Sequence, residues 1–117
     1  MQAPESGIYE VEHTILSHLG EKECSCIIFH DGKTKWTVKL TGYVNDFKLT
    51  LVSDALNEEE LRLKKDQGVT DERLLTAKWG GGDTIIGAPR YHNGSAPFIP
   101  KNRITEIVLE SLNKQLA

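Results

Sequence analysis

The feature that most constrains the fold is an Asp-Gly pair, Asp31-Gly32, between two runs of strand-forming residues. Asp-Gly is a strong signal for the tight turn of a β-hairpin, because its residues tolerate the positive φ angles that such turns need. After the pair, Trp36, Val38 and Leu40 alternate with polar residues. This alternation is the period of a strand with one buried face. The sequence therefore predicts an antiparallel hairpin over residues 23–40.

The length of the turn decides which side chains of this hairpin share a face. A two- or four-residue turn places odd positions of the first strand beside even positions of the second. The expected buried face then holds Ser25, Ile27, Phe29, Trp36, Val38 and Leu40, and the exposed face holds Cys24, Cys26, Ile28, His30, Lys33, Lys35 and Lys39. Residues 47–53 alternate in the same way, so we expect a third strand with Phe47, Leu49 and Leu51 inward and Lys48 outward.

Helical spacing marks the remaining elements. Residues 4–20 predict a helix from the spacing of Ile8, Val11, Ile15 and Leu19, with Ser6 as its cap and Gly20 at its end. Residues 53–68 predict a second helix that ends at Gly68 and carries the surface pairs Glu58–Arg62 and Glu60–Lys64. A short helix over 70–80, capped by Thr70, and an amphipathic helix over 102–117, with Ile104, Ile107, Val108, Leu112 and Leu116 on its apolar face, complete the set.

The segment 80–100 is the least regular part of the chain. It holds three glycines in a row, three prolines and the turn signal Asn93-Gly94, and it predicts an edge hairpin or an ordered loop. The predicted fold class is α+β: an antiparallel meander of three or more strands with helices packed on one face, in the order α-β-β-β-α-α-(β-β)-α. At 117 residues the chain fits a single domain over 1–117.

Charge and apolar runs narrow the classes of function. The net charge is −3, which disfavours a dedicated nucleic-acid binder, although a local basic face stays compatible with one. The sequence shows neither a signal peptide nor an apolar run of membrane-spanning length. Cys24 and Cys26 stand one residue apart, too close on a strand to bridge without distortion. Free thiols suit a reducing compartment, so we expect a cytoplasmic protein.

The same thiols raise a metal and a redox hypothesis. Cys24, Cys26 and His30 are expected on one face, and His13 and His18 lie near in sequence. Zinc sites usually space two cysteines two to four residues apart on a turn, so this spacing argues against zinc. Neighbouring lysines would lower a thiol pKa, but no histidine–acid pair stands beside the thiols as base and orienter. We therefore expect no metal, no cofactor and no catalytic set.

Two candidate contact surfaces are left. The first is the lysine-bearing sheet face, formed by Lys33, Lys35, Lys39 and Lys48. Its positive charge suits an acidic partner. The alternative is that these lysines only keep an exposed sheet soluble. The second is the irregular segment with Trp79, Asp83, Arg90, Tyr91 and His92, since aromatic residues and arginine are common interface anchors. Both surfaces indicate contact with another protein.

The expected function is that of a small cytoplasmic protein-binding inhibitor, such as an immunity protein or a phage-encoded antagonist. The predicted order of elements also resembles that of effector-binding type III secretion chaperones, which implies an acidic homodimer that binds an effector. A small enzyme using Asp83, Arg90, His92 or the thiols, and a nucleic-acid-binding protein using the lysine face, are the further alternatives. Binding to a protein partner, without catalysis, is the hypothesis carried forward.

Overall fold

The computed structural model describes residues 10–19, 22–31, 34–42 and 47–115. Its sheet contains β1 (Glu10–Leu19), β2 (Lys22–His30), β3 (Trp36–Gly42), β4 (Gly80–Gly81) and β5 (Ile85–Gly87). The strands lie in the order β1-β2-β3-β5-β4, and every neighbouring pair is antiparallel. The α+β class with an antiparallel sheet is thus confirmed.

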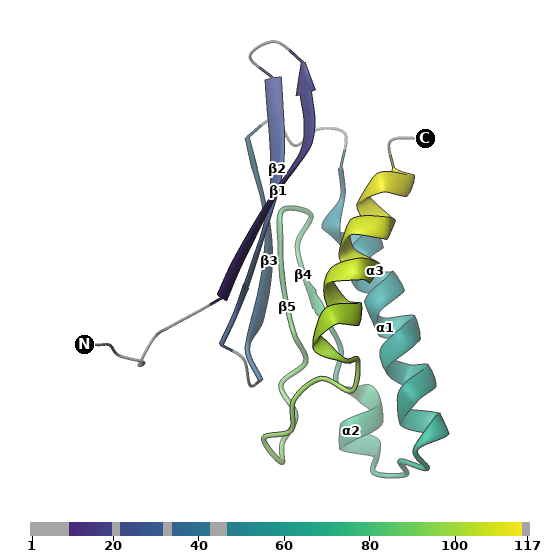
Figure 1. Ribbon diagram of the computed structural model, residues 1–117. Helices are drawn as coiled ribbons and strands as arrows, with labels where there is room; N and C mark the ends of the chain where they lie inside the picture. Colours follow the sequence, from purple (N-terminus) through teal and green to yellow (C-terminus); the bar gives the residue numbers. More distant parts are fainter. Residues whose placement is uncertain (1–9, 20–21, 32–33, 43–46, 116–117) are drawn as a thin grey trace, which may run out of the picture.

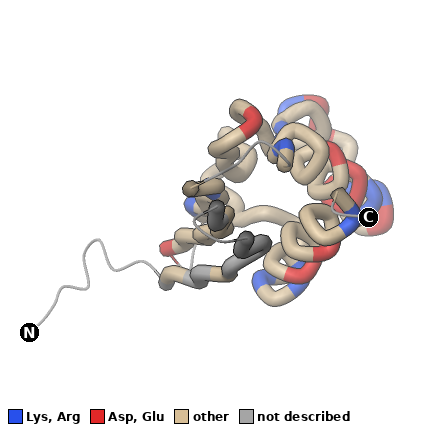
Figure 2. The backbone as a smooth tube through the Cα atoms, turned by 90° about the horizontal axis from the view of Figure 1, so that it is seen from above, with Lys and Arg blue, Asp and Glu red and all other residues tan. Residues whose placement is uncertain are grey.

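Three helices complete the described fold: α1 (Leu49–Asp66), α2 (Glu72–Thr76) and α3 (Lys101–Lys114). The two long helices α1 and α3 lie side by side on the same side of the sheet (Figures 1 and 2). The other face of the sheet has no described helix over it (Figure 1). The described residues therefore form a two-layer structure, in which helices cover one face of the sheet and no described helix covers the other.

The hairpin predicted from Asp31 is confirmed, and so is the buried face of its second strand, but the predicted faces of its first strand are wrong. His30 lies opposite Trp36, Ile28 opposite Val38, and Cys26 opposite Leu40. An odd number of residues, 31–35, separates the two strands, so even positions meet even positions. The backbone N–H of Lys35 donates to the Asp31 carboxylate at 3.1 Å, which helps to fold this connection. Gly32 and Lys33 lie outside the described residues.

The covered face of the sheet therefore carries the residues that were expected outside. Cys24, Cys26, Ile28 and His30 are at most 2% exposed. Cys24, Cys26 and Ile28 join Trp36, Val38, Leu40 and Ile86 against the apolar faces of α1 and α3. The helix residues of this cluster are Leu49, Val52, Leu56, Ile104, Ile107, Val108 and Leu112. This single cluster is the hydrophobic core, and its burial is the main stabilising term of the fold.

The helix predicted for residues 4–20 is wrong over its described part. Residues 10–19 form strand β1, which pairs with β2 along its length and shifts register once, between Ile15 and Ser17. Val11, expected in an apolar helix stripe, is 54% exposed. Ser6, Ile8 and Gly20, the other expected markers of this helix, lie outside the described residues. Pairing with β2 outweighs the local helical spacing.

The predicted third strand over residues 47–53 is also wrong, because helix α1 begins at Leu49. Phe47, Leu49 and Val52 are buried, while Leu51 is 49% exposed. The helical period therefore starts four residues before Ser53, the predicted beginning. At the other end, Gly68 has φ +74° directly after the helix, which confirms the expected stop. The predicted meander exists, but its three strands are β1, β2 and β3.

Residues 70–100 combine a confirmed hairpin with two corrections. The cap of α2 is Asp71, whose carboxylate accepts from the N–H of Arg73 at 2.9 Å, so Thr70 is not the cap. An edge hairpin does form, from β4 and β5. Its turn lies at 82–84, where the N–H of Gly82 donates to the carbonyl of Ile85. Asn93-Gly94 instead turns the loop that follows β5, with Gly94 at φ +75°.

The terminal helix α3 is confirmed, with Ile104, Ile107, Val108 and Leu112 buried. Leu116 lies outside the described residues. The Gln115 side chain, just after α3, accepts from the Lys48 N–H at 2.7 Å and donates to the Lys48 carbonyl at 3.1 Å. These two bonds fasten the end of α3 to the start of α1. Within the described residues, no helix is long and apolar enough to cross a membrane.

Candidate functional site

The structure separates the residues expected to contact a partner into exposed and buried groups. Lys35, Lys39, Lys48, Asp83, Arg90 and His92 are exposed, whereas Trp79 and Tyr91 are buried at 2% and 6% exposure. Lys33 lies outside the described residues. Only some members of the two predicted surfaces are therefore available for contact.

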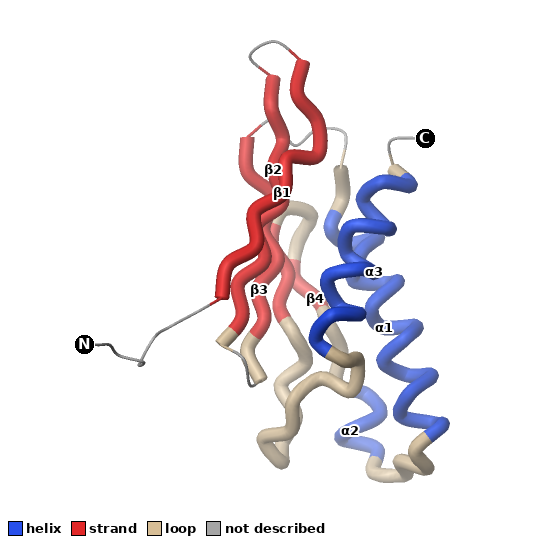
Figure 3. The backbone as a smooth tube through the Cα atoms, in the orientation of Figure 1, coloured by secondary structure: helices blue, strands red, loops and turns tan. Residues whose placement is uncertain are grey.

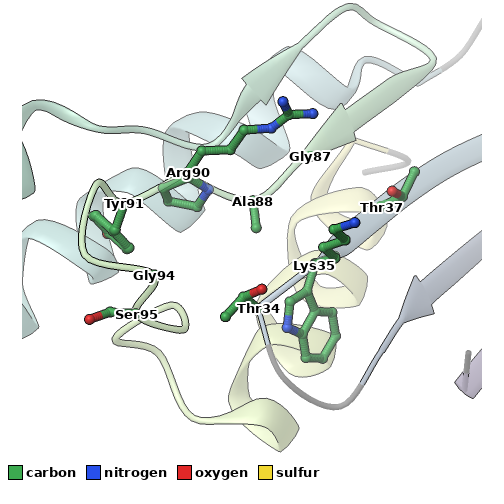
Figure 4. A pocket seen from close by; sticks show the side chains of 11 residues that line it. Thr34, Lys35, Thr37, Gly87, Ala88, Arg90, Tyr91, Gly94 and Ser95 are labelled. Atoms are coloured by element: carbon green, nitrogen blue, oxygen red, sulfur yellow. The ribbon is translucent and has the colours of Figure 1, made fainter. Parts of the chain in front are cut away.

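A cavity of about 420 Å³ brings the two predicted surfaces together. It lies between the start of β3 and the loop after β5, and Lys35 and Arg90 both line it. Figure 4 shows the two basic side chains on either side of the Gly87–Ala88 segment. Thr34, Thr37 and Ser95 add hydroxyl groups to its wall. The sequence did not predict this meeting, because it depends on how the loop 88–95 folds back beside β3. We call this the basic cavity.

A more open hollow of about 600 Å³ continues the basic cavity on the far side of Arg90. Thr37, Gly87, Ala88 and Arg90 line both spaces. Lys78 lines the second one and adds a cation that the sequence analysis missed. The only sequence signal for Lys78 was its place beside Trp79. No Asp or Glu is among the described lining residues of either space.

A buried carboxylate holds the loop that forms the basic cavity. Glu60, only 1% exposed, accepts from the Tyr91 hydroxyl at 2.6 Å and from the Phe98 N–H at 2.6 Å. Longer bonds come from the indole N–H of Trp79 at 3.3 Å and the N–H of Ile99 at 3.4 Å. Glu60 and Lys64 are near each other as expected, but their expected exposure to solvent is wrong. Glu60 instead ties both sides of the irregular segment to α1, and so positions Tyr91 beside the cavity.

Lys64 is the second charged group in this interior, at 2% exposure. Its ammonium donates to the Ala77 carbonyl at 3.1 Å and lies 4.8 Å from the centre of the Tyr91 ring. Burial lowers the pKa of Lys64, and the nearby Glu60 carboxylate opposes part of that effect. Burial and the hydrogen bond to Glu60 raise the pKa of Tyr91, which keeps its phenol protonated. Glu60, Lys64 and Tyr91 have a structural role, because their described hydrogen bonds join α1 to the chain segments packed against it.

Three further predicted contact residues have structural roles. The His92 imidazole lies 3.0 Å from the Asp71 carboxylate, which connects the loop to the start of α2. The N–H of Arg73 lowers the pKa of Asp71, and His92 adds to that effect. Asp83 accepts from the Leu49 N–H at 2.9 Å and the Thr50 hydroxyl at 2.8 Å, so it braces the first turn of α1. Lys48 lies at the same helix start, and neither it nor Asp83 lines the basic cavity.

The thiols and His30 lie in the core and not beside the lysines. His30 stacks on Trp36 with ring centroids 4.3 Å apart. Cys24 and Cys26 are fully or almost fully buried. Among the described residues, no group of three or more His, Cys, Asp or Glu side chains is placed to hold a metal ion. Their arrangement suits packing, since a free cysteine behaves in a core as a small hydrophobic residue.

The uncovered face of the sheet is a further candidate contact surface, beside the basic cavity. The register aligns Val11, Phe29 and Thr37 in one row and Ile27, Lys39 and Ile85 in the next. Val11 and Ile85 are 54% and 48% exposed, while Ile27 and Phe29 are half-buried. We call these six residues the outer face. It is largely apolar, with Lys39 as its described charge.

Comparison with known proteins adds no assignment. No protein family, no curated protein and no solved structure matches this chain. Its function must therefore be argued from the outer face and the basic cavity alone.

Proposed function

We propose that this chain is a small protein-binding protein that holds its partner against the outer face. The observation that carries the proposal is the exposure of Val11 and Ile85 on a sheet face with no described helix over it. Contiguous apolar side chains on a soluble surface commonly mark interaction sites. Half-buried Phe29 and Ile27 lie between them in the register and supply the bulky contacts that interface centres use.

The charge of this surface favours a partner segment that is apolar and acidic. Lys39 lies within the outer face and Lys35 at its end, and neither ammonium has a described ion-pair partner. A carboxylate on the partner would pair with Lys39 while apolar residues cover Val11 and Ile85. Inhibition of the partner is the activity we propose for this contact. The buried thiols of Cys24 and Cys26 support action in a reducing compartment such as the cytoplasm.

Capture from a lysate of the source cells, with matched variants, tests this function. Val11→Asp and Lys39→Glu should each reduce capture of the specific partner. Leu61→Asp and Lys65→Glu make the same changes at exposed positions of α1 and should retain it. With the purified partner, Val11→Asp should weaken binding by about 1–2 kcal/mol, the loss typical of an interface anchor. Circular dichroism checks that each variant is folded.

Equal loss of capture with the α1 variants, or no loss with the outer-face variants, would contradict the proposal. The homodimer alternative draws its support from β1, a ten-residue strand at the edge of the sheet (Figure 3). Such an edge offers unpaired backbone groups to another strand. Sedimentation of the purified chain over a range of concentrations separates the two, since a stable dimer would favour the alternative.

A further inference from the structure

We infer that the basic cavity, which adjoins the outer face at Thr37, is a binding site for a small organic phosphate. Two cations from distant parts of the chain, Lys35 before β3 and Arg90 after β5, line one cavity. No described acidic side chain lines it or pairs with either cation. An anion in this cavity would meet two cations and no described acidic group, so the charge of the lining attracts it.

The donors around the cavity match a phosphate better than a carboxylate. The Arg90 guanidinium can donate two parallel bonds, and the Lys35 ammonium supplies a point charge. Hydroxyls of Thr34, Thr37 and Ser95 line the same wall and can also donate. A phosphate monoester carries close to two negative charges and three acceptor oxygens, so it can engage several of these donors together. A planar carboxylate presents two oxygens and fewer bonds.

The size of the space indicates an organic ligand and not a bare ion. A volume of about 420 Å³ falls within the range of small-molecule sites. Gly87 and Ala88 form part of the lining with almost no side-chain bulk, which leaves the space open. Glu60 fixes Tyr91 next to Arg90 through the 2.6 Å bond to its hydroxyl. The wall is therefore held in place before any ligand binds, which lowers the entropy cost of binding.

The test is a two-dimensional amide NMR titration of the full chain with phenyl phosphate. Saturable shifts should gather at the amides of Gly87, Ala88, Arg90 and Ser95. Arg90→Gln and Lys35→Gln should each weaken binding about tenfold or more, as expected for a lost charged hydrogen bond. Lys65→Gln, an exposed lysine on α1 that lines neither space, should leave the affinity unchanged. All three positions are exposed, and the amide spectrum reports whether each variant folds.

Two comparison probes test which class of ligand the cavity prefers. Benzoate and inorganic phosphate should both bind more weakly than phenyl phosphate. Equal or tighter binding of benzoate would overturn the phosphate assignment, and equal binding of inorganic phosphate would overturn the organic one. Absence of saturable shifts, or shifts that Lys65→Gln weakens equally, would overturn the site itself. Val11→Asp, which tests the protein-binding function, should not change this titration, so the two proposals can fail separately.

Discussion

At the scale of single residues, Glu60 shows how a polar side chain can organise an otherwise irregular segment. One carboxylate accepts hydrogen bonds from Trp79, Tyr91, Phe98 and Ile99, which together span the segment from α2 to α3. Together with its turns and the contact of His92 with Asp71, this carboxylate defines the path of the loop 88–99 beside β3. The geometry of the basic cavity therefore depends on a residue that does not touch it.

This dependence makes Glu60→Ala strongly destabilising. The change leaves a buried hydroxyl, an indole N–H and two backbone N–H groups without their acceptor, and leaves Lys64 buried without the nearby carboxylate. We expect a loss of about 3–5 kcal/mol in the free energy of unfolding, measured by urea denaturation. Glu58→Ala, at an exposed position of the same helix, should change it by less than about 0.5 kcal/mol. Similar losses for both variants would show that Glu60 is not the organising residue.

Glu60 also illustrates a limit of prediction at this scale. The run Glu58-Glu59-Glu60 has the composition of a solvent-exposed helix face, and two of its members behave in that way: Glu58 is exposed, and Glu59 pairs with Arg62 at 2.6 Å. What separates Glu60 is its four-residue spacing from buried Leu56 and Lys64 on one stripe of α1. That stripe was visible in the sequence. The groups that donate hydrogen bonds to Glu60 lie 19 to 39 residues away along the chain, and no local pattern indicates them.

At the scale of elements, the β4–β5 hairpin depends on Gly81, because backbone atoms of Ile85 occupy the space that a side chain there would need. Gly81 has φ +153°, and a Cβ there would clash with the carbonyl oxygen of Ile85. Gly80 has open space around the same position. We expect Gly81→Ala to lower the free energy of unfolding by about 1–3 kcal/mol, and Gly80→Ala to change it much less. Chemical denaturation of both variants measures the difference, and equal effects would contradict the steric argument.

The elements were predicted best where period and boundary signals agreed. Helix α3 has a clear apolar stripe, and it lies where the sequence placed it. The first strand was missed because Val11, Ile15 and Leu19 fit a helix by spacing, although β-branched Val11, Thr14 and Ile15 also suit a strand. The decisive fact is the ladder with β2, which is tertiary. The start of α1 was missed because Phe47, Leu49 and Leu51 alternate, while Leu49, Val52 and Leu56 carry the helical period that prevails.

The hairpin β2–β3 shows how one small error propagates through a whole surface. The turn was located correctly, but its loop has an odd number of residues where an even number was assumed. That parity exchanged the two faces of the first strand, so the thiols moved to the core while Ile27 and Phe29 moved to the outer face. Lys35 and Lys39 stayed outside, since the second strand kept its expected orientation. The basic cavity could not be predicted at all, because it joins β3 to a loop more than fifty positions later.

At the scale of the whole molecule, the reactivity of the two buried thiols measures how often the core opens. Cys24 and Cys26 are at most 1% exposed and belong to the same cluster as α1 and α3. A thiol reagent can reach them only when that cluster opens. We expect labelling of the native protein at least about a thousandfold slower than in urea-unfolded protein, with both thiols reacting together. Mass spectrometry over time measures this, and rapid labelling of one thiol would show that β2 opens on its own.

The two candidate surfaces divide the molecule between its layers. The helical layer supplies stability through the core and through Glu60. Charged residues along each of its two long helices also form salt bridges within that helix. The sheet and its loop supply the outer face and the basic cavity. Substitutions on the exposed side of α1 are therefore suitable controls for both proposals, because they change charge or polarity without touching either surface.

The strand order has a consequence for how the chain folds. Strands β1, β2 and β3 are consecutive, so their pairing closes only short loops, whereas β5 pairs with β3 after the intervening helices and joins positions 39 and 85. Closing the longer loop costs more chain entropy before any contact compensates for it. Docking of β5 is therefore the natural late step of folding. The walls that Arg90 and Ala88 contribute to the basic cavity would be completed only in that step.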